Sequence, residues 1–428
     1  MTYEQTIDYL YNSAPMFQKI GSAAYKEGME NSFLIDEHLG YPHRRYATVH
    51  VAGTNGKGSV CHMLASVLQE AGYRTGLYTS PHLLDFRERI RVNGRMIDKD
   101  YLVSFVGKHR KFFESIKPSF FELTTGMAFA YFADCGVDIA VIEVGLGGRL
   151  DCTNVITPVL SVITNISHDH TALLGDTLTA IAHEKAGIIK HNVPVVIGEA
   201  QGEVRKVFES YERAKVAAND FLFAEDENPV ISSKILPSGH WLFECVKYLH
   251  LENELGGYAQ EKNTATTLCA IDVLNRSQFK IPDACVRSGF LNVTGNTGLM
   301  GRWQIIGKEP KIILDTGHNV GGMEYNVRQL LSEKFDRLHI VFGMVNDKDI
   351  SDVLALLPKD AKYYFTQASI ARALDSGVLS EKAYGYGLHG QSFATVAGAL
   401  GAAKDCANER DVIFVGGSTF IVADALGV

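Results

Sequence analysis

A glycine-rich segment, VAGTNGKGSV at residues 51–60, has the composition of a phosphate-binding loop. In the usual form GxxxxGK[ST], backbone N–H groups surround a phosphate and the lysine offsets its charge. Gly56 and Lys57 match this pattern, but its first glycine is a valine here, and Gly58 separates Lys57 from the hydroxyl of Ser59. The alternative is a turn that binds nothing. Because a lysine between two glycines gives a turn no structural benefit, we favour phosphate binding.

Four further polar residues could take part in such chemistry: Ser80 ends LYTS, Glu143 ends VIE, His170 closes SHDH and Lys185 lies in HEKAGIIK. Mg²⁺ prefers oxygen ligands and usually takes one or two carboxylates together with substrate phosphates, so Glu143 is the best metal candidate. A salt-bridged acid at a strand end is its alternative. Ser80 could equally cap a turn, and His170 could lie in a polar loop. From the residues alone, Lys185 is better explained as a solvated lysine of a helix.

The segments around these residues predict a sheet that brings them to one edge. YATVHVA before the loop is β-branched, and after the loop apolar residues recur at helical spacing from Val60 to Ala71. The segments RTGLYTS, VDIAVIEVG, PVLSVITNIS and VPVVIG also read as strands, and helices are predicted over Phe121–Cys135 and Leu178–Ile189. Such alternation predicts a parallel sheet covered by helices, with ligands beyond the carboxyl ends of the strands.

A chain of 428 residues exceeds the size at which a single core stops growing, so two domains are expected. Residues 221–257 are less regular, and residues 293–303 are rich in glycine and turn formers. We therefore predict an N-terminal P-loop parallel-sheet ATPase domain over 1–296 and a smaller, Rossmann-like α/β domain over 297–428. The strands of the second domain are predicted in KIILDTGHN, RLHIVFGMVNDKD, AKYYFTQA and DVIFVGGSTF.

The segment FRERIRVNGRMI, Phe86–Ile97, alternates in polarity and contains Asn93-Gly94, a strong signal for a β-hairpin. Its four arginines could form one cationic face for an anionic substrate. A solvated hairpin face is the more common outcome for such a run.

The composition limits the possible partners and the compartment. A net charge of −8 argues against a general nucleic-acid surface. Seven cysteines without CxxC spacing indicate reduced thiols rather than a disulfide framework or a zinc site. The segment MTYEQTIDYL lacks the apolar core of a signal peptide, and no apolar run is long enough to span a bilayer. The expected location is the cytoplasm, with no membrane and no nucleic acid as partner.

Taken together, these motifs resemble the folylpolyglutamate synthase and dihydrofolate synthase branch of the Mur ligase superfamily. The resemblance extends over nearly the whole chain and depends on eight segments in order: HVAGTNGKGSV, LYTSPHLLDFRERIRVNG, FFELTT, VIEVGLGGRLDCTNVI, SHDHTALLGDTLTAIAHEKAGIIK, GRWQ, LDTGHN and NDKD. A glycine after the loop lysine is this family's form of the loop. One departure is DTGHNV, where the family commonly has DGAHNP.

The resemblance implies an ATP-dependent ligase that uses Mg²⁺. By this resemblance, Ser80 and Glu143 would bind one Mg²⁺ and His170 would bind a second. Lys185 would be carbamylated and would help to bind the second ion. The residues implied to be catalytic are Lys57, Lys185 and His318. The residues implied to bind the nucleotide are Thr54, Asn55, Gly56, Lys57, Gly58, Ser59, Asn263, Arg302 and Asp315.

The same resemblance implies the substrates, which are L-glutamate and a pteroate or folate. Phe121 and Glu122 resemble the start of the pterin-side motif, Asp151 lies in a second stretch near that pocket, and Lys348 and Ser418 resemble the amino-acid side. The candidate substrate residues are Pro81, His82, Phe86, Arg89, Phe121, Glu122, Asp151, Lys348 and Ser418. The γ-phosphate would activate a carboxylate as an acyl phosphate, which the amine of glutamate attacks. Whether the acceptor is dihydropteroate, a reduced folate or both stays open at this stage.

Two other functions fit parts of the sequence. A Mur ligase of cell-wall synthesis normally has a whole domain before the loop, and the segment ahead of Gly53 is too short for one. A nucleotide-switch protein would need an NKxD guanine motif, which NDKD at 346–349 is not. We therefore expect a glutamate ligase that acts on small molecules, as a monomer.

Overall fold

The computed structural model describes residues 1–12, 28–217, 220–346 and 350–427. The chain forms two compact units, Met1–Glu254 with Gln260–Leu299, and Leu255–Ala259 with Met300–Val428. The short segment 255–259 therefore belongs with the C-terminal unit, although it lies far from it in the sequence. Gln329 holds this segment, because its Nε2 donates to Gly256 O at 2.8 Å and its Oε1 accepts from Tyr258 N–H at 2.6 Å.

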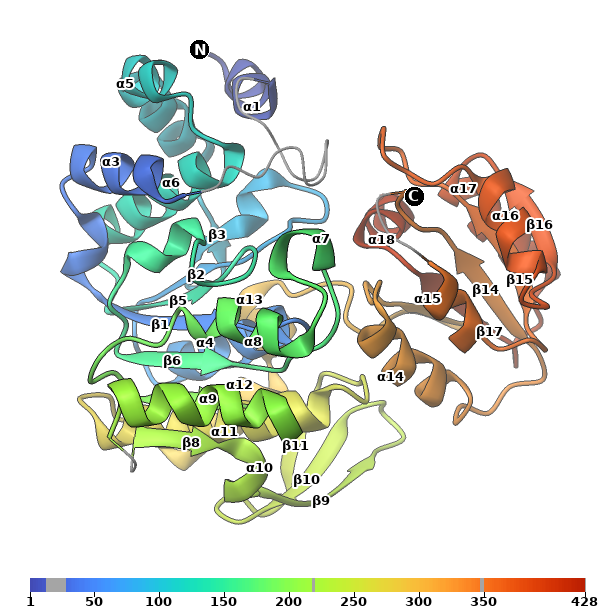
Figure 1. The fold of residues 1–428 in the computed structure, drawn as a ribbon. Coiled ribbons are helices and arrows are strands. Elements are labelled where there is room, and N and C mark those ends of the chain that lie inside the picture. Colours follow the sequence, from blue (N-terminus) through green and yellow to red (C-terminus); the bar gives the residue numbers. More distant parts are fainter. Residues whose placement is uncertain (13–27, 218–219, 347–349, 428) are drawn as a thin grey trace. The chain divides into compact units, whose positions relative to one another are not determined.

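The N-terminal unit is built on an eight-stranded sheet with the order β4-β3-β2-β5-β1-β6-β7-β8 (Figure 1). The six strands from β2 to β8 in this order are parallel, and β3 and β4 add antiparallel pairs at one edge. The bounds are β1 Ala47–Ala52, β2 Thr75–Tyr78, β3 Ile90–Val92, β4 Arg95–Met96, β5 Ile139–Glu143, β6 Leu160–Ile163, β7 Val195–Ile197 and β8 Phe221–Phe223.

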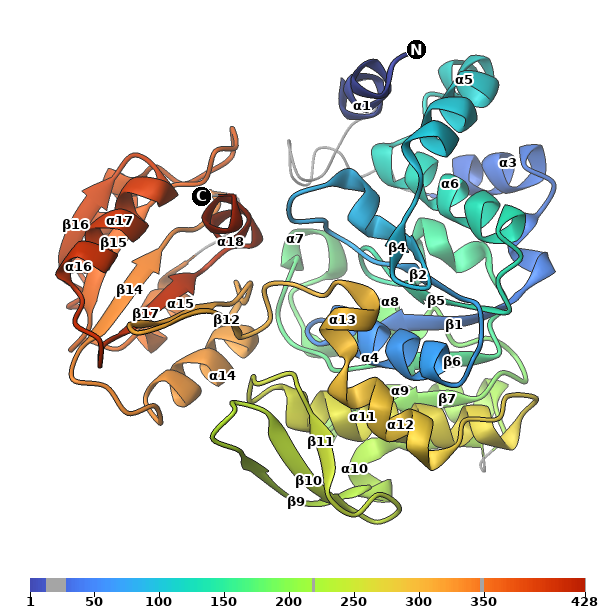
Figure 2. The ribbon, with the colours of Figure 1, turned by 180° about the vertical axis from the view of Figure 1, so that it is seen from behind.

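Helices cover both sides of this sheet, as Figures 1 and 2 show for α3, α5 and α6 on one side and α11 and α12 on the other. The bounds are α1 Tyr3–Asn12, α3 Glu30–His38, α4 Lys57–Glu70, α5 Lys99–Ile116, α6 Phe120–Asp134, α7 Thr171–Leu174, α8 Leu178–Ala186, α9 Gly202–Lys215, α10 Ala224–Glu227, α11 Gln260–Arg276, α12 Asp283–Leu291 and α13 Val293–Thr297, with 3₁₀ turns η2 Pro42–Arg45, η3 Phe86–Arg89 and η4 Cys152–Val155. The predicted parallel-sheet architecture is confirmed.

The register of the sheet places the predicted site residues side by side. Val51 near the end of β1 lies opposite Glu143 of β5 and Val162 of β6. Since the strands are parallel, the loops after β1, β5 and β6 leave from the same edge, which is where ligands bind in such sheets. Side chains on both faces of β5 are buried, which explains the continuous apolar run before Glu143.

Two segments differ from their predictions. The predicted hairpin at 86–97 is shorter, because residues 86–89 form η3 and only β3 and β4 pair around Asn93-Gly94. Residues 221–257, which show little regularity in the sequence, contain β8, α10 and a three-stranded antiparallel sheet with the order β11-β10-β9. Its strands are β9 Val230–Ile235, β10 Trp241–Cys245 and β11 Leu251–Asn253. In β9, VISSKI, no residue is fully buried, so the strand has no alternating apolar pattern.

The C-terminal unit has a six-stranded sheet with the order β12-β13-β17-β14-β15-β16. All neighbours are parallel except β12, which pairs antiparallel with β13 at one edge. The strands are β12 Gln304–Lys308, β13 Lys311–Leu314, β14 Leu338–Phe342, β15 Lys362–Thr366, β16 Gly390–Phe393 and β17 Val412–Gly416, and the helices are α14 Val320–Leu330, α15 Ser351–Leu356, α16 Ser376–Tyr384, α17 Val396–Cys406 and α18 Thr419–Leu426. The predicted second α/β domain is confirmed as a fold. In the part of the chain that is described, no helix has the length and apolarity needed to cross a membrane.

His50 is a buried polar residue in the centre of β1. Its Nε2 lies 2.8 Å from Thr153 Oγ1, and its Nδ1 is buried with no hydrogen-bonding partner. Protonation would place an N–H on both ring nitrogens, and Nδ1 has no acceptor to donate to. Burial, followed by the charge of Lys190, lowers the pKa of His50 to about 3. The imidazole is therefore neutral in the folded state at neutral pH.

This arrangement predicts acid sensitivity. Between pH 6.5 and 3 the unfolded chain binds a proton at His50 that the folded chain does not, so the free energy of unfolding should fall with pH by up to about 1.4 kcal/mol per unit. Urea unfolding at pH 7.5, 6.0 and 5.0 measures this slope for the native protein and for His50→Gln. The variant should lose the part of the slope that belongs to His50, and equal slopes would contradict the prediction.

Candidate functional site

The glycine-rich loop after β1 is held in place by the segment that follows β6. Thr54 N–H donates to the backbone carbonyl of Asn165, and Asn55 N–H donates to the side-chain Oδ1 of Asn165, both at 2.9 Å. Thr54 and Ser167 exchange two hydrogen bonds of 3.1 Å. The conformation of the loop is therefore set by the protein itself, which is the preorganisation that an anion site needs.

Two glycines of the loop need backbone conformations that favour glycine. Gly53 has φ +145°, and a Cβ there would lie 1.8 Å from Thr164 Oγ1. Gly56 has φ +83°, and a Cβ there would lie 2.2 Å from Asn263 Oδ1. Helix α4 begins directly afterwards, so its first N–H groups and the positive end of its dipole lie at the loop.

Two lysines converge on one carbonyl of this loop. Lys57 Nζ donates to Gly53 O and to Thr54 O, both at 3.0 Å, and Lys185 Nζ donates to the same Gly53 O at 2.9 Å. Lys185 is 4% exposed, and burial followed by the charge of Lys57 lowers its pKa from 10.5 to about 7. The interpretation of Lys185 as a solvated lysine of a helix is therefore wrong, because its side chain is buried at the loop.

Glu143 and Ser80 meet at the ends of β5 and β2. Glu143 is 4% exposed, and its Oε2 accepts a hydrogen bond from Ser80 N–H at 2.9 Å. Glu143 pairs with Val51 of β1, and the next residue, Val144, donates its N–H to Val51 O at 2.9 Å, so Glu143 lies next to the strand end where the loop begins. A buried carboxylate beside a hydroxyl and a lysine is a suitable set of groups for a phosphate-bound cation.

His170 lies at the start of the short helix α7, with φ +51°. Its Nε2 is 3.8 Å from Asp169 Oδ1, and its backbone N–H donates to the same oxygen at 2.9 Å. The negative charge of Asp169 acts to raise the pKa of Lys185, which places Asp169 near Lys185. Over residues 1–12, 28–217, 220–346 and 350–427, no group of three or more His, Cys, Asp or Glu side chains is arranged around a metal position.

Asn263 and Ser59 connect the loop to α11. Asn263 approaches Gly56 so closely that a side chain at this glycine would meet its Oδ1. Asn263 Nδ2 donates to Gln260 Oε1 at 2.9 Å, and Gln260 Nε2 donates to Ser59 Oγ at 3.3 Å. The structure thus brings Asn263, which follows the loop by about 200 residues in the sequence, against the loop itself. Gly58 is buried in the first turn of α4.

The start of α6 forms the other side of the site. Ser119 and Glu122 form a capping box, in which Glu122 Oε2 accepts from Ser119 N–H at 2.6 Å and Ser119 Oγ accepts from Glu122 N–H at 3.2 Å. The Phe121 ring stacks on Tyr78 at 5.7 Å, and a Cβ on Gly145 would collide with this ring. Phe121 therefore reaches from α6 to the glycines after β5.

Residues 80–89 place an unusual polar group beside this aromatic cluster. Arg89 is 3% exposed, its Nε donates to His82 Nδ1 at 2.8 Å, and His82 Nε2 lies 3.3 Å from Tyr11 Oη. Burial and the charge of Arg89 lower the pKa of His82 to about 3. Phe86 is buried next to Phe120, at 5.8 Å between ring centroids. Pro81 is exposed in the loop directly after Ser80.

The four arginines of this segment do not share one face. Arg89 and Arg91 are buried, Arg87 pairs with Asp85 at 2.7 Å, and Arg95 is exposed. The idea of one cationic face is therefore wrong, because a 3₁₀ turn followed by two very short strands directs the four side chains to different surroundings.

The carboxylate of Asp151 is occupied by its own loop. Oδ1 accepts from Thr153 N–H at 3.0 Å and from the Thr153 hydroxyl, and Oδ2 accepts from Leu146 N–H at 2.9 Å. Asp151 is 5% exposed and caps η4. Its hydrogen bonds hold the turn that carries Cys152 beside α3 and α6.

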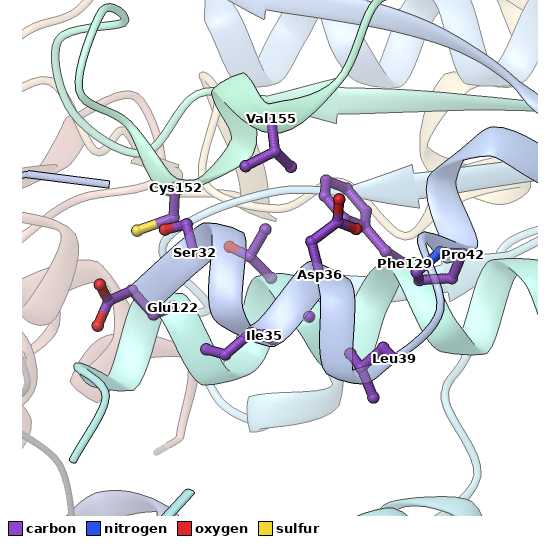
Figure 3. Close-up of a pocket in the computed structure, with 11 residues that line it drawn as sticks. Ser32, Ile35, Asp36, Leu39, Pro42, Glu122, Phe129, Cys152 and Val155 are labelled. Atoms are coloured by element: carbon purple, nitrogen blue, oxygen red, sulfur yellow. The ribbon is translucent and has the colours of Figure 1, made fainter. Parts of the chain in front are cut away.

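A small cavity lies between α3, α6 and η4 (Figure 3). The cavity has room for about one water molecule. Its lining includes Ser32, Asp36, Glu122, Cys152 and Phe129, together with apolar residues. One of its polar atoms, Asp36 Oδ1, is buried with no hydrogen-bonding partner, whereas the Ser32 hydroxyl lies against the Cys152 thiol.

In the C-terminal unit, Asp315 organises the loop after β13. Its Oδ1 accepts from Gly317 N–H and Asn326 Nδ2, and its Oδ2 accepts from Trp303 N–H, all at 2.8 Å. His318 Nδ1 lies 3.1 Å from Thr316 O, which leaves Nε2 as the outer nitrogen. The departure DTGHNV still gives an ordered turn, because Asn319 caps α14 through Gly322 N–H at 2.9 Å.

The remaining predicted residues of this unit are less informative. Arg302 is partly exposed between two buried residues before β12. Ser418 is buried and caps α18, where its Oγ accepts from Phe420 N–H at 3.2 Å. Lys348 lies outside the described residues. Sequence reasoning missed Asn165, which follows a predicted strand end and holds the loop.

Two family models match the chain, the Mur ligase middle domain over residues 51–234 and the Mur ligase glutamate ligase domain over residues 301–419. The dihydrofolate synthase/folylpolyglutamate synthase of Bacillus subtilis is 34% identical over 379 residues, which are 84% of this chain and 86% of the relative. A probable bifunctional folylpolyglutamate synthase/dihydropteroate synthase of Haloferax volcanii is 33% identical over 99% of this chain, and this chain spans only 50% of that relative.

Solved structures show the same similarity. Escherichia coli FolC in complex with DHPP and ADP has a TM-score of 0.83 and 29% identity, and the match covers 100% of this chain and 97% of that chain. A bifunctional folylpolyglutamate synthase/dihydrofolate synthase with Mn, AMPPNP and L-glutamate bound has a TM-score of 0.81 and 28% identity, over 100% of this chain and 98% of that chain.

Proposed function

Because the chain belongs to the folylpolyglutamate synthase and dihydrofolate synthase family of Mur ligases, we propose that it is an ATP-dependent ligase that adds L-glutamate to dihydropteroate, to a reduced folate or to both. The reaction passes through an acyl phosphate and forms ADP and phosphate. The observation that carries this proposal is the loop at 53–59, where two lysines share the Gly53 carbonyl, and which leaves β1 at Val51, opposite the buried Glu143.

The oxygen donors at the ends of β2 and β5 fit a magnesium ion. Glu143 and Ser80 would hold the ion that accompanies the nucleotide, because a buried carboxylate and a hydroxyl are suitable ligands for Mg²⁺. Such an ion supplies charge that stabilises the transferring phosphoryl group. His170 and Lys185 would hold a second ion.

Lys185 fits that second role only after modification. As an amine it shares Gly53 O with Lys57, so two potential cations lie at one carbonyl. Addition of CO₂ to the neutral amine, with release of one proton, would give a carbamate and so turn one of them into a carboxylate, which is a metal ligand and an electrostatic partner for Lys57. We infer that Lys185 is carbamylated in the active enzyme.

The chain's own residues account for the remaining steps. Lys57 and the first N–H groups of α4 hold the phosphates, since they lie at one preorganised loop. Asn263 lies where it can contact the nucleotide, and Phe121, with its neighbours, orients the acceptor. Asp315, His318, Arg302 and Ser418 belong to the domain at 297–428, to which we assign the glutamate side. Exclusion of water protects the acyl phosphate from hydrolysis.

The experiment that tests this proposal is phosphate release from ATP with Mg²⁺ and L-glutamate, with dihydropteroate or tetrahydrofolate as the acceptor. Release that depends on glutamate with both acceptors is the result we expect, and it would establish both activities. Release with one acceptor fixes the substrate. Absence of release with either acceptor would overturn the proposal in favour of a Mur-type amino-acid ligase, which the relatives of this chain support less.

We further propose that the enzyme is a cytoplasmic monomer with no nucleic-acid partner. All seven cysteines are free thiols, in keeping with a reducing compartment. The net charge of −8 gives no basis for binding nucleic acid.

A further inference from the structure

A lysine and a cysteine of the C-terminal unit lie in contact at its surface. Lys362 begins β15, and Cys406 ends α17, the helix that packs against β14 and β15. Lys362 Nζ donates to Cys406 Sγ at 3.4 Å. The Cys406 thiol is exposed, whereas the other cysteines are buried or partly buried, so it is the thiol that a small oxidant in solution reaches most easily.

Buried neighbours hold this thiol in place. The Tyr364 hydroxyl hydrogen-bonds to the Cys406 thiol, and its Oη lies 3.0 Å from His339 Nδ1. His339 Nε2 in turn lies 3.2 Å from Asp411 Oδ2. Tyr364, His339 and Asp411 are each at most 2% exposed, so close packing fixes this chain of contacts and keeps the phenol against the sulfur.

The two direct neighbours of the sulfur favour its ionised form. The thiolate is the form that reacts with oxidants, and a nearby cation and hydrogen-bond donors stabilise it. Hydrogen bonds from Tyr364 and from Lys362 lower the pKa of the Cys406 thiol, although the charge of Asp405 acts in the opposite direction. Burial raises the pKa of Cys135, which is partly exposed. Cys406 therefore carries more thiolate at neutral pH than Cys135 does.

Oxidation by hydrogen peroxide has a balanced course at this pair. The Cys406 thiolate attacks one peroxide oxygen, so that an S–O bond forms and the O–O bond breaks with release of hydroxide. The Lys362 ammonium gives a proton to this hydroxide, which leaves a sulfenic acid, water and a neutral amine. The amine then attacks the sulfur. An S–N bond forms, and the hydroxyl departs with one amine proton as a second water molecule.

We propose that Lys362 and Cys406 form a peroxide-responsive modification site, in which oxidation of the thiol joins Lys362 Nζ to Cys406 Sγ by a reversible covalent bond. The contact of 3.4 Å places the amine where it can capture the sulfenic acid before a separate thiol arrives. The bond would tie the first residue of β15 to the last residue of α17. A thiol reductant would cleave it by attack at the sulfur.

This pair lies away from the residues that we assign to the ligase reaction. Strands β14, β15 and β17 are parallel, and Lys362 is the first residue of β15, whereas Ser418 follows the end of β17. The two residues therefore lie at opposite edges of the sheet. The inference is independent of the proposed function, and its test measures covalent structure instead of turnover.

The test treats the native full-length protein with hydrogen peroxide at pH 7.5 and maps its peptides by mass spectrometry without reductant. We expect a cross-linked peptide pair that contains Lys362 and Cys406, is lighter by two hydrogens than the separate peptides, and is separated by dithiothreitol. Cys285→Ser, which removes a partly exposed thiol of α12, is the matched control and should give the same cross-link.

Lys362→Arg keeps the positive charge but removes the nucleophilic amine. In this variant the sulfenic acid at Cys406 should persist, and dimedone should label it about tenfold more than in the native protein. Lys362→Gln, a second variant without the amine, should give the same result if the arginine disturbs the fold. Equal labelling of Cys406 in the native protein and both variants, oxidation that falls first on other cysteines, or a cross-link that Cys285→Ser abolishes would overturn the inference.

Discussion

Replacement of Glu143 by glutamine is expected to lower glutamate-dependent phosphate release on the order of 10³-fold at a fixed Mg²⁺ concentration. The amide can still accept the Ser80 N–H hydrogen bond of 2.9 Å, so the local backbone should keep its shape. What the variant loses is the negative charge that attracts the cation. A bound metal supplies several kcal/mol of transition-state stabilisation, which corresponds to this range of rates.

The measurement is a titration with Mg²⁺ at saturating ATP. The variant should need a much higher Mg²⁺ concentration for half-maximal rate, in addition to its lower maximal rate. Asp138→Asn is a matched control, because Asp138 directly precedes the same strand and its Oδ2 accepts Arg74 N–H at 2.7 Å at the opposite end. If Glu143→Gln keeps the native Mg²⁺ dependence, Glu143 is not a metal ligand.

Lys57→Ala should lower turnover on the order of 10²-fold, about 3 kcal/mol, which is typical of the loss of one preorganised donor at a developing charge. The amine lies 3.0 Å from Gly53 O and Thr54 O, so it is fixed at the loop without a contact to an acidic side chain in the described chain. The variant should therefore lose rate with ATP and still unfold near the native temperature.

Single-turnover measurements with saturating ATP separate the chemical step from nucleotide binding in this variant. Lys206→Ala serves as the control, since Lys206 is an exposed lysine of α9 that pairs with Glu203 at 2.6 Å. Its turnover should equal that of the native protein. Near-native turnover of Lys57→Ala would remove this lysine from the mechanism.

The sequence was informative where local pattern and tertiary structure agree. Long apolar runs next to glycines predicted β1, β5 and β6, because strands buried on both faces carry such runs. The loop at 53–59 could be recognised because its glycines are needed locally, as the backbone φ of +145° at Gly53 and +83° at Gly56 demonstrates. The predicted strands were longer than the observed ones; of PVLSVITNIS, for example, only Leu160–Ile163 pairs as a strand.

What the sequence could not provide are contacts between distant segments. The burial of Lys185 depends on Gly53, 132 residues earlier, so a lysine that reads as a solvated helix residue lies inside the site. Asn165 braces Asn55 from the end of another strand. The cavity beside Ser32 and Asp36 depends on how α3 packs on α6 and η4, which no local pattern reports.

The chain crosses between its two units at residues 254–255, 259–260 and 299–300, so the C-terminal unit is not a simple appendage. A fragment that ends at residue 299 would keep Gly256 and Tyr258 but remove Gln329, which holds both of them. Gln260, the next residue after this segment, donates to Ser59 beside the phosphate loop. Separate expression of the halves should therefore give an N-terminal fragment with a disturbed nucleotide loop, and a split protein should regain activity only when the two fragments are produced together.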